Sequence, residues 1–466
     1  MAPKCCHFEE GSAVKYVKTD RGLLSFFSQV GSSSMAKLGA LASVALLLSG
    51  AAVVAEDWPN WRGPLNNGIS SEKDIAITWS ADKNVLWKTP LPGPAGSTPV
   101  VWGNQIFLTT VTESGDLQVL GLSAKDGAVQ WVKTVSNSTL TARGDEGNAA
   151  SPSPVTDGQH VWAFFGDGTL ACLTVDGKEV WKFNVQDRYG KFNIQFGMSS
   201  TPLLRNGVLY LQLLHGDGDP KTREARVVAM DALTGQEKWA VDRPSDGSDE
   251  NEHSYASPVF FGEGDETILV THGADYTVGH RLTDGSEVWR MSGLNPTAKY
   301  DRTLRFVASP VAAGDLLVIP TAKRGPVMGI KPKPGKDLFK TEAHLWQWER
   351  TPDVPSPLIL DGLVYLCMHD GNLNVLEADT GKEVYFERTH RQRHRASPVY
   401  ADGHIYLTAR DGKVTVVKTG RKFEVVAENE IPESISSSPV ISNGTLYLRT
   451  FSNLYAIRES SRSPSK

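Results

Sequence analysis

The chain has 466 residues, a formal net charge of −5, 40% hydrophobic residues and 22% charged residues. This is ordinary globular composition, with enough apolar residues to bury a core. The small net charge gives no support for binding to nucleic acid or to a membrane surface.

The first predicted element is a secretory signal at residues 35–55. Met35 and Lys37 supply a start and one positive charge, and an apolar run covers residues 38–48. The small residues that end at Ala55 suit signal cleavage before an acidic mature start. Residues 1–34 are then interpreted as an N-terminal extension that precedes the true start at Met35.

A membrane anchor is the alternative interpretation of residues 35–55. The apolar run is short for a membrane span, and Gly39, Ser43 and Gly50 interrupt it. We therefore expect a secreted or periplasmic protein that has no integral membrane segment after signal removal.

Residues 56–84 are predicted to form an N-terminal strap. The strap carries the run Asp57–Pro64, which contains Trp58 and Trp61. We expect these two tryptophans to pin the strap to the flank of the domain that follows.

A short phrase of a small residue, a proline and an aliphatic residue recurs through the rest of the chain. Successive prolines lie 41 to 56 residues apart, and self-similarity at such a period indicates a repeat architecture. The eight copies are Thr98–Val100, Ser153–Val155, Thr201–Leu203, Ser257–Val259, Ser309–Val311, Ser356–Leu358, Ser397–Val399 and Ser438–Val440.

Each unit is predicted to be a four-stranded antiparallel meander. Residues 397–427 show four strand-like runs that are separated by turns such as Asp402-Gly403 and Asp411-Gly412. A turn glycine is also followed four residues later by a large aromatic residue, which we expect to pack between neighbouring units. These aromatics are Trp131, Trp181, Trp239, Trp289 and Tyr385.

Radial stacking of eight such sheets buries the faces that one sheet alone leaves open. The sequence therefore predicts an all-β protein with an eight-bladed β-propeller at residues 85–458 and a C-terminal tail at 459–466. The last unit, 438–458, holds only three strands, whereas Asn84–Thr89 reads as a lone strand. We expect this N-terminal strand to complete the last blade and close the ring.

The fifth unit is irregular. Lys331–Lys336 replaces the usual Asp-Gly turn with a basic, proline-containing projection. Such a segment suits either contact with a partner or a tolerated surface insertion.

The repeats resemble the PQQ-like propeller family, in which pyrroloquinoline quinone (PQQ) is one member's cofactor. Ala229–Trp239 and Leu376–Glu383 are similar to its Ala-Leu-Asp-x-x-Thr-Gly-Lys run, and the resemblance covers roughly residues 85–458. The run Asp57–Pro64 is similar to the mature N-termini of secreted members from planctomycete-like bacteria. Relatives include quinoprotein dehydrogenases and the propeller subunit of the outer-membrane β-barrel assembly machinery, which docks partner proteins.

The resemblance to quinoprotein dehydrogenases would imply PQQ with calcium and a disulfide between adjacent cysteines. The adjacent pair Cys5-Cys6 lies before the predicted signal, and no Glu/Asn/Asp calcium trio is placed by motif. Cys172 and Cys367 are predicted to be buried thiols. We therefore predict no metal site and no catalytic residue, and we keep PQQ with calcium as an alternative.

The loops that lead into the innermost strands carry several Arg and His residues. Propellers usually bind at the central opening, and arginine captures carboxylate or phosphate in a bidentate manner. The alternative is that these cations pair internally, with Glu252 and Asp353 as partners. The candidate residues of the axial funnel are His253, Arg302, Arg305, Arg393, His394 and Arg395.

The predicted function is a non-catalytic binding scaffold for an unidentified protein partner or a small anionic ligand. The alternative is a quinoprotein oxidoreductase that depends on PQQ and calcium. Fold-level analogy to the assembly propellers is the basis of the first.

Overall fold

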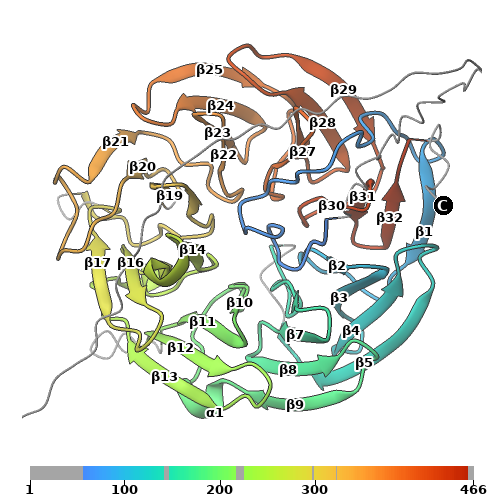
Figure 1. Cartoon of the computed structure of the whole chain (residues 1–466), viewed down its shortest axis with the longest axis horizontal. Helices are drawn as coiled ribbons and strands as arrows, with labels where there is room; N and C mark the ends of the chain where they lie inside the picture. Colours follow the sequence, from blue (N-terminus) through green and yellow to red (C-terminus); the bar gives the residue numbers. More distant parts are fainter. Residues whose placement is uncertain (1–55, 141–145, 217–224, 296–298, 322, 460–466) are drawn as a thin grey trace, which may run out of the picture. The chain divides into compact units, whose positions relative to one another are not determined.

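The computed structural model describes residues 56–140, 146–216, 225–295, 299–321 and 323–459. These residues form eight four-stranded antiparallel sheets around a central axis, as Figure 1 shows. The predicted all-β eight-bladed propeller is thus confirmed. The predicted extension, the signal and all but the first residue of the tail lie outside the described residues.

Blades are numbered here from the N-terminus, and their strands run from the innermost to the outermost position. Blades 1 to 4 comprise β2 (Val100–Trp102), β3 (Gln105–Val111), β4 (Asp116–Ser123) and β5 (Val129–Asn137); β6 (Val155–Thr156), β7 (His160–Phe164), β8 (Thr169–Thr174) and β9 (Glu179–Asn184); β10 (Leu203–Arg205), β11 (Val208–Leu214), β12 (Ala225–Asp231) and β13 (Glu237–Asp242); and β14 (Val259–Phe261), β15 (Ile268–Gly273), β16 (Tyr276–Arg281) and β17 (Glu287–Met291).

Blades 5 to 8 repeat the same order. They comprise β18 (Val311–Ala313), β19 (Leu316–Pro320), β20 (Val327–Ile330) and β21 (His344–Trp348); β22 (Leu358–Leu360), β23 (Leu363–Cys367), β24 (Asn372–Glu377) and β25 (Glu383–Arg388); β26 (Val399–Ala401), β27 (His404–Thr408), β28 (Lys413–Lys418) and β29 (Val425–Glu430); and β30 (Val440–Ser442), β31 (Thr445–Arg449), β32 (Asn453–Ile457) and β1 (Val85–Pro90).

Only short helices interrupt the strands of the described residues, and none of them is long and apolar enough to cross a membrane. They are α1 (Gln186–Tyr189) and the 3-10 helices η1 (Asp249–Glu252) and η2 (Gly264–Glu266).

The ring is closed by the two ends of the described chain, as predicted. Strand β1 pairs antiparallel with β32, and Trp87 lies opposite Ala456. Lys88 in β1 donates a hydrogen bond of 3.0 Å to Glu433, which precedes blade 8. The last blade is therefore built from both ends of the repeat region.

A ring of hydrogen bonds explains the repeated Ser/Thr-Pro phrase. The backbone N–H of the Ser or Thr in each blade donates to the side-chain hydroxyl of its counterpart in the next blade, over 2.8 to 3.2 Å. The circle closes where Ser438 donates to Thr98. The following proline has no N–H to donate, so it suits the first residue of a strand. We call these eight residues the Ser/Thr ring.

The repeated aromatics pack between neighbouring blades, as predicted. Trp131 lies against Gly177 of the next blade, where a Cβ would come within 2.7 Å of the indole. Its Nε1 also donates to Val175 O over 2.9 Å. The same pair recurs as Trp181 with Gly235, so each turn glycine receives the ring of the preceding blade. These indoles are half-buried at the rim of the ring.

The irregular segment of blade 5 lies along the outer edge of blade 4, although its residues 333–337 are exposed. It runs beside β17 as a parallel partner, because Gly335 N–H donates to Val288 O (3.1 Å) and Leu338 N–H donates to Arg290 O (2.8 Å). This contact covers the outer edge of blade 4 and leaves Trp289 only 1% exposed. The segment thus protects an edge strand of its own chain.

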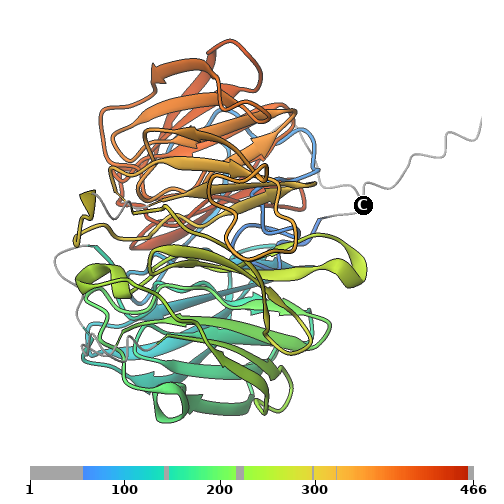
Figure 2. The ribbon, with the colours of Figure 1, turned by 90° about the vertical axis from the view of Figure 1, so that its left-hand side faces the viewer.

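The strap crosses one face of the ring. Figure 2 turns the ring edge-on, with the strap in blue on one face. Trp58 is fully buried and its backbone pairs with Val101. Arg62 reaches the axis, where it donates to the carbonyl oxygens of Ser356 (3.3 Å) and Pro357 (2.8 Å). The strap therefore seals one mouth of the central channel.

Candidate binding site

The unsealed mouth of the channel opens into a cavity of about 920 Å³. In every blade, the residue two positions before the Ser or Thr of the Ser/Thr ring lines this cavity. These residues are Gly96, Ser151, Ser199, Tyr255, Val307, Val354, Arg395 and Ser436. We call this cavity the funnel, and the buried Ser/Thr ring follows these wall residues in each blade. All inner strands run in the same direction along the axis. The funnel residues precede the Ser/Thr ring, whereas the strap contacts Val101 and Pro357, which follow it. The funnel and the strap therefore lie at opposite mouths of the channel.

The structure brings four of the six candidate residues to the funnel. Arg305, Arg393, His394 and Arg395 line it. Their role in ligand binding stays a prediction.

Arg302 and His253 do not line the funnel, which corrects the predicted location of these two residues. Arg302 lies on the outer surface, 3.3 Å from Asp249 of η1, with 72% of its side chain exposed. His253 turns away from the axis, pairs with the backbone of His215 in blade 3 and is buried. Both residues precede an inner strand, but neither is among the residues that line the funnel.

The two histidines add no positive charge. Burial lowers the pKa of His394 to about 4, so its ring in the funnel wall is neutral at physiological pH. Burial also lowers the pKa of His253 to about 4, and the nearby ring of His215 adds to the shift. The expected dense group of Arg and His is therefore a group of arginines, which Lys323 joins from blade 5.

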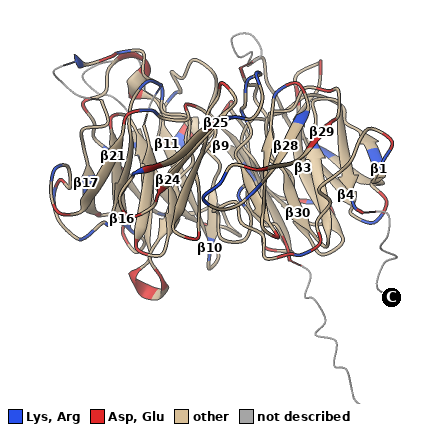
Figure 3. Cartoon of the chain, turned by 90° about the horizontal axis from the view of Figure 1, so that it is seen from above, with Lys and Arg blue, Asp and Glu red and all other residues tan. Residues whose placement is uncertain are grey.

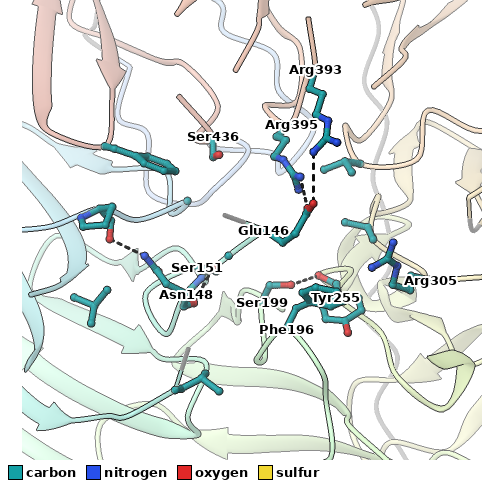
Figure 4. A pocket seen from close by; sticks show the side chains of 18 of the residues that line it. Glu146, Asn148, Ser151, Phe196, Ser199, Tyr255, Arg305, Arg393, Arg395 and Ser436 are labelled. Carbon is teal, nitrogen blue, oxygen red and sulfur yellow. Dashed lines mark hydrogen bonds and ion pairs between the residues drawn. The ribbon is translucent and has the colours of Figure 1, made fainter. Parts of the chain in front are cut away.

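The carboxylate of Glu146 forms ion pairs with two of these arginines. Glu146 Oε1 lies 3.6 Å from Arg393 Nη1, and its Oε2 forms an ion pair with Arg395. Figure 4 shows dashed lines from the Glu146 carboxylate to both guanidinium groups, which lie on the same side of it. The predicted internal partners were Glu252 and Asp353, so sequence reasoning missed Glu146.

Asp353 is another carboxylate of the funnel, and His369 and Lys323 lie near it. Its carboxylate lies 3.9 Å from His369 Nδ1, and Arg305 pairs with Glu250 of η1 over 3.5 Å. Burial raises the pKa of Asp353, while the nearby cations, Lys323 among them, oppose the rise. Figure 3 shows the same pattern along the loops, where both signs of charge lie close together. The predicted role of Asp353 as an internal partner is thus supported by its surroundings.

The funnel has two unlike sides. The loops of blades 5 to 7 supply Arg305, Lys323, Asp353, Arg393 and Arg395. The loops of blades 8, 1, 2, 3 and 4 supply mostly neutral residues, namely Val111, Ser138, Thr139, Leu140, Ser151, Phe196, Ser199, Tyr255, Ser436 and Phe451.

Two aromatic rings shape the neutral side. Phe196 and Tyr255 meet edge to face, with centroids 5.8 Å apart. Ser199 Oγ donates to Tyr255 O over 2.8 Å and fixes this segment. The neutral side thus offers apolar surface together with hydroxyl groups, which is typical of small-molecule sites.

The described residues do not fit PQQ with calcium. Among them, no group of three or more His, Cys, Asp or Glu side chains could hold a metal ion. The funnel carboxylates Glu146 and Asp353 already face cations. The cysteines of the described part, Cys172 and Cys367, are free, buried and in different blades, so they cannot form a disulfide between adjacent residues.

Comparison with known proteins matches the repeat region. A family model described as the outer membrane protein assembly factor BamB matches residues 68–191, 145–319 and 275–464. BamB of Yersinia pestis is 27% identical over 176 residues, which is 37% of this chain and 40% of that protein. The putative dehydrogenase XoxF of Paracoccus denitrificans is 29% identical over 206 residues, 42% of this chain and 31% of that protein. The aligned segments span less than half of each relative.

Solved structures show the same fold. BamB from Moraxella catarrhalis superposes with a TM-score of 0.58 at 14% identity, over 80% of this chain and 99% of that one. A europium-containing methanol dehydrogenase superposes with a TM-score of 0.64 at 12% identity, over 85% of this chain and 90% of that one. An assembly factor and a methanol dehydrogenase thus share this architecture.

Proposed function

The chain belongs to the PQQ-like propeller family that is described by the assembly factor BamB, and we propose that it is a non-catalytic binding scaffold. The scaffold acts in the periplasm or outside the cell, and its ligand enters the open funnel. The ligand is a small anion or an anionic group of a protein partner.

The observation that carries this proposal is that the cationic side chains of the funnel are paired with carboxylates. A funnel of about 920 Å³ is large enough for a small molecule or a chain end. Its cations face Glu146, Glu250 and Asp353 rather than a shared reaction centre. Such an arrangement can hold a charged group.

The strap supports the same proposal. Arg62 fills the axis at the other mouth, so a ligand can reach the Ser/Thr ring only from the funnel side. The rigid ring then presents the funnel residues from fixed strand ends, which favours binding without large rearrangement.

A quinoprotein oxidoreductase is the second candidate. The similarity to XoxF and to the europium-containing methanol dehydrogenase favours it. When bound, PQQ with a metal ion would supply the oxidising chemistry. The residues described above do not fit that pair, so we assign no step to them.

The test combines quinone uptake with anion binding. The full chain is mixed with PQQ and calcium, and absorbance and alcohol oxidation are measured. We expect no turnover. Turnover that depends on PQQ would overturn the scaffold proposal.

Calorimetry with carboxylate ligands then locates the site. We expect Arg393→Ala to weaken binding at least tenfold. Arg302→Ala is the matched control, because Arg302 lies outside the funnel and pairs with Asp249. Equal binding by both variants would remove the funnel as the site.

A further inference from the structure

Glu146 is held in the funnel by residues that are far away in sequence. It lies 249 positions before Arg395, and each of its two carboxylate oxygens faces a different arginine. Figure 4 shows the side chain reaching across the opening from the neutral side to the charged side. The pair therefore joins the two sides of the funnel.

The two arginines differ in how firmly they are placed. The side chain of Arg395 is only 14% exposed, whereas that of Arg393 is 65% exposed and that of Glu146 is 36% exposed. Arg395 thus forms a fixed part of the wall. Glu146 has access to solvent, and it regains hydration when it leaves its partners, so loss of these partly exposed ion pairs costs little.

A carboxylate is the group that this pair of guanidinium groups fits. Guanidinium donors match the geometry of carboxylate oxygens, and exchange of one carboxylate for another conserves the charge of the funnel. A ligand with its carboxylate at Arg393 and Arg395 would extend its body toward Phe196 and Tyr255, on the neutral side.

This inference rests on the proposed function and names the ligand class. We propose that the funnel binds a carboxylic acid with a neutral, partly apolar body, and that Glu146 occupies the place of the ligand carboxylate until the ligand displaces it. Glu146 is therefore an internal competitor. The apparent affinity for the acid is lowered by the fraction of molecules in which Glu146 holds the arginines.

The acid comes from one of two sources, a free small molecule or the C-terminus of a peptide chain. Both present the same group to the arginines. N-acetylphenylalanine represents the first source, and the tetrapeptide Ala-Ala-Ala-Phe represents the second. For each probe, the matching C-terminal amide keeps the body and removes the charge.

The experiment is calorimetry on the full chain at low ionic strength, with both acids and both amides. We expect at least one acid to bind, and its amide to bind at least tenfold more weakly. Glu146→Gln should raise the affinity for that acid about three- to tenfold, because two partly exposed ion pairs are lost. The same substitution should leave amide binding unchanged.

Arginine variants complete the test. Arg395→Gln should bring the acid down to the affinity of its amide. Because Arg395 is nearly buried, Arg393→Gln serves as a second variant that leaves the wall intact, and Arg302→Gln is the control that should bind as the wild type does.

Failure of this inference differs from failure of the proposed function. Equal acid affinity in wild type and Glu146→Gln, or equal binding of acid and amide, would overturn the proposed role of Glu146 as a competitor. Either result would leave the proposal that the funnel binds a ligand intact. Absence of binding by all four probes would also overturn it. Turnover with PQQ would overturn the scaffold itself.

Discussion

The two mouths of the propeller hold arginine in opposite ways. At the sealed mouth, Arg62 is fully buried and donates to backbone carbonyls, and burial lowers its pKa to about 9. At the open mouth, Arg393 and Arg395 face the carboxylate of Glu146. A backbone carbonyl cannot leave its place, whereas a side-chain carboxylate can be exchanged for that of a ligand. The comparison teaches that the same residue type is structural at one mouth and available for binding at the other.

Removal of the sealing segment should have the largest effect. Deletion of residues 56–90 removes both the strap and β1, and exposes the edge of β32. We expect aggregation and the loss of a cooperative unfolding transition, measured by light scattering and thermal melting. The control is Leu65→Ser, because Leu65 is 77% exposed within the strap. A soluble, cooperatively folded deletion variant would show that the seal is dispensable.

Loss of Arg62 alone should have the next largest effect. Arg62→Ala leaves buried carbonyl groups without their donor and should lower the free energy of unfolding by about 2–4 kcal/mol. Arg302→Ala, at an exposed ion pair, should change it by less than about 0.5 kcal/mol. Urea unfolding measures both. Equal losses of unfolding free energy in the two variants would contradict the expected difference between a buried and an exposed arginine.

The Ser/Thr ring between the two mouths should show a smaller, local effect. Ser309→Ala removes the hydroxyl that accepts the Ser257 N–H over 2.8 Å, and should cost about 1–2 kcal/mol. Ser309→Thr should be close to neutral, because Thr98 and Thr201 hold the same position in blades 1 and 3. The free energy of unfolding of both variants checks this. A neutral alanine variant would refute the role of the ring.

Acid should have the smallest of these effects, and one contribution to it comes from Glu433 beside blade 8. Burial raises the pKa of Glu433, but hydrogen bonds from Thr450, Tyr455, Asn453 and Lys88 outweigh it and lower the pKa to about 2, from 4.5. The folded state therefore gains stability above pH 4.5, and this gain is lost as the pH falls toward 2.

Glu433→Gln should remove that part of the acid dependence. Chemical unfolding at pH 7, 4 and 3 should show a steeper decline in the wild type than in the variant. Arg62→Ala should keep the slope of the wild type, because the described hydrogen-bond partners of Arg62 are carbonyl groups. Identical slopes for wild type and Glu433→Gln would contradict the assignment.

The repeat made the fold predictable, because each copy carries its own turns and its own proline. The repeat even located the closing strand, because the last unit has only three strands and residues 84–89 provide the fourth. The site was less predictable. His253 and His394 each lie a few residues before an inner strand, yet only His394 lines the funnel. The path of each loop decides which of its side chains reach the funnel, and the repeat does not encode that path.

Asp353 was expected as an internal partner of the funnel cations, but Glu146 could not be predicted as the partner of Arg393 and Arg395. Glu146 meets Arg395 only because the ring brings the loop before blade 2 across the axis from blade 7. No local pattern signals a contact over 249 positions. Arg62 was hidden for the same reason, because its acceptors Ser356 and Pro357 lie in blade 6.

The last bond of the Ser/Thr ring joins Ser438 to Thr98, 340 positions apart. Early blades therefore cannot complete the circle while the chain is still being synthesised, and must wait for the final strands to arrive. Contacts at such long range slow folding and prolong exposure of unfinished edges. A chain that is exported unfolded would meet this delay after translocation, where a chaperone that shields strand edges would have the most to do.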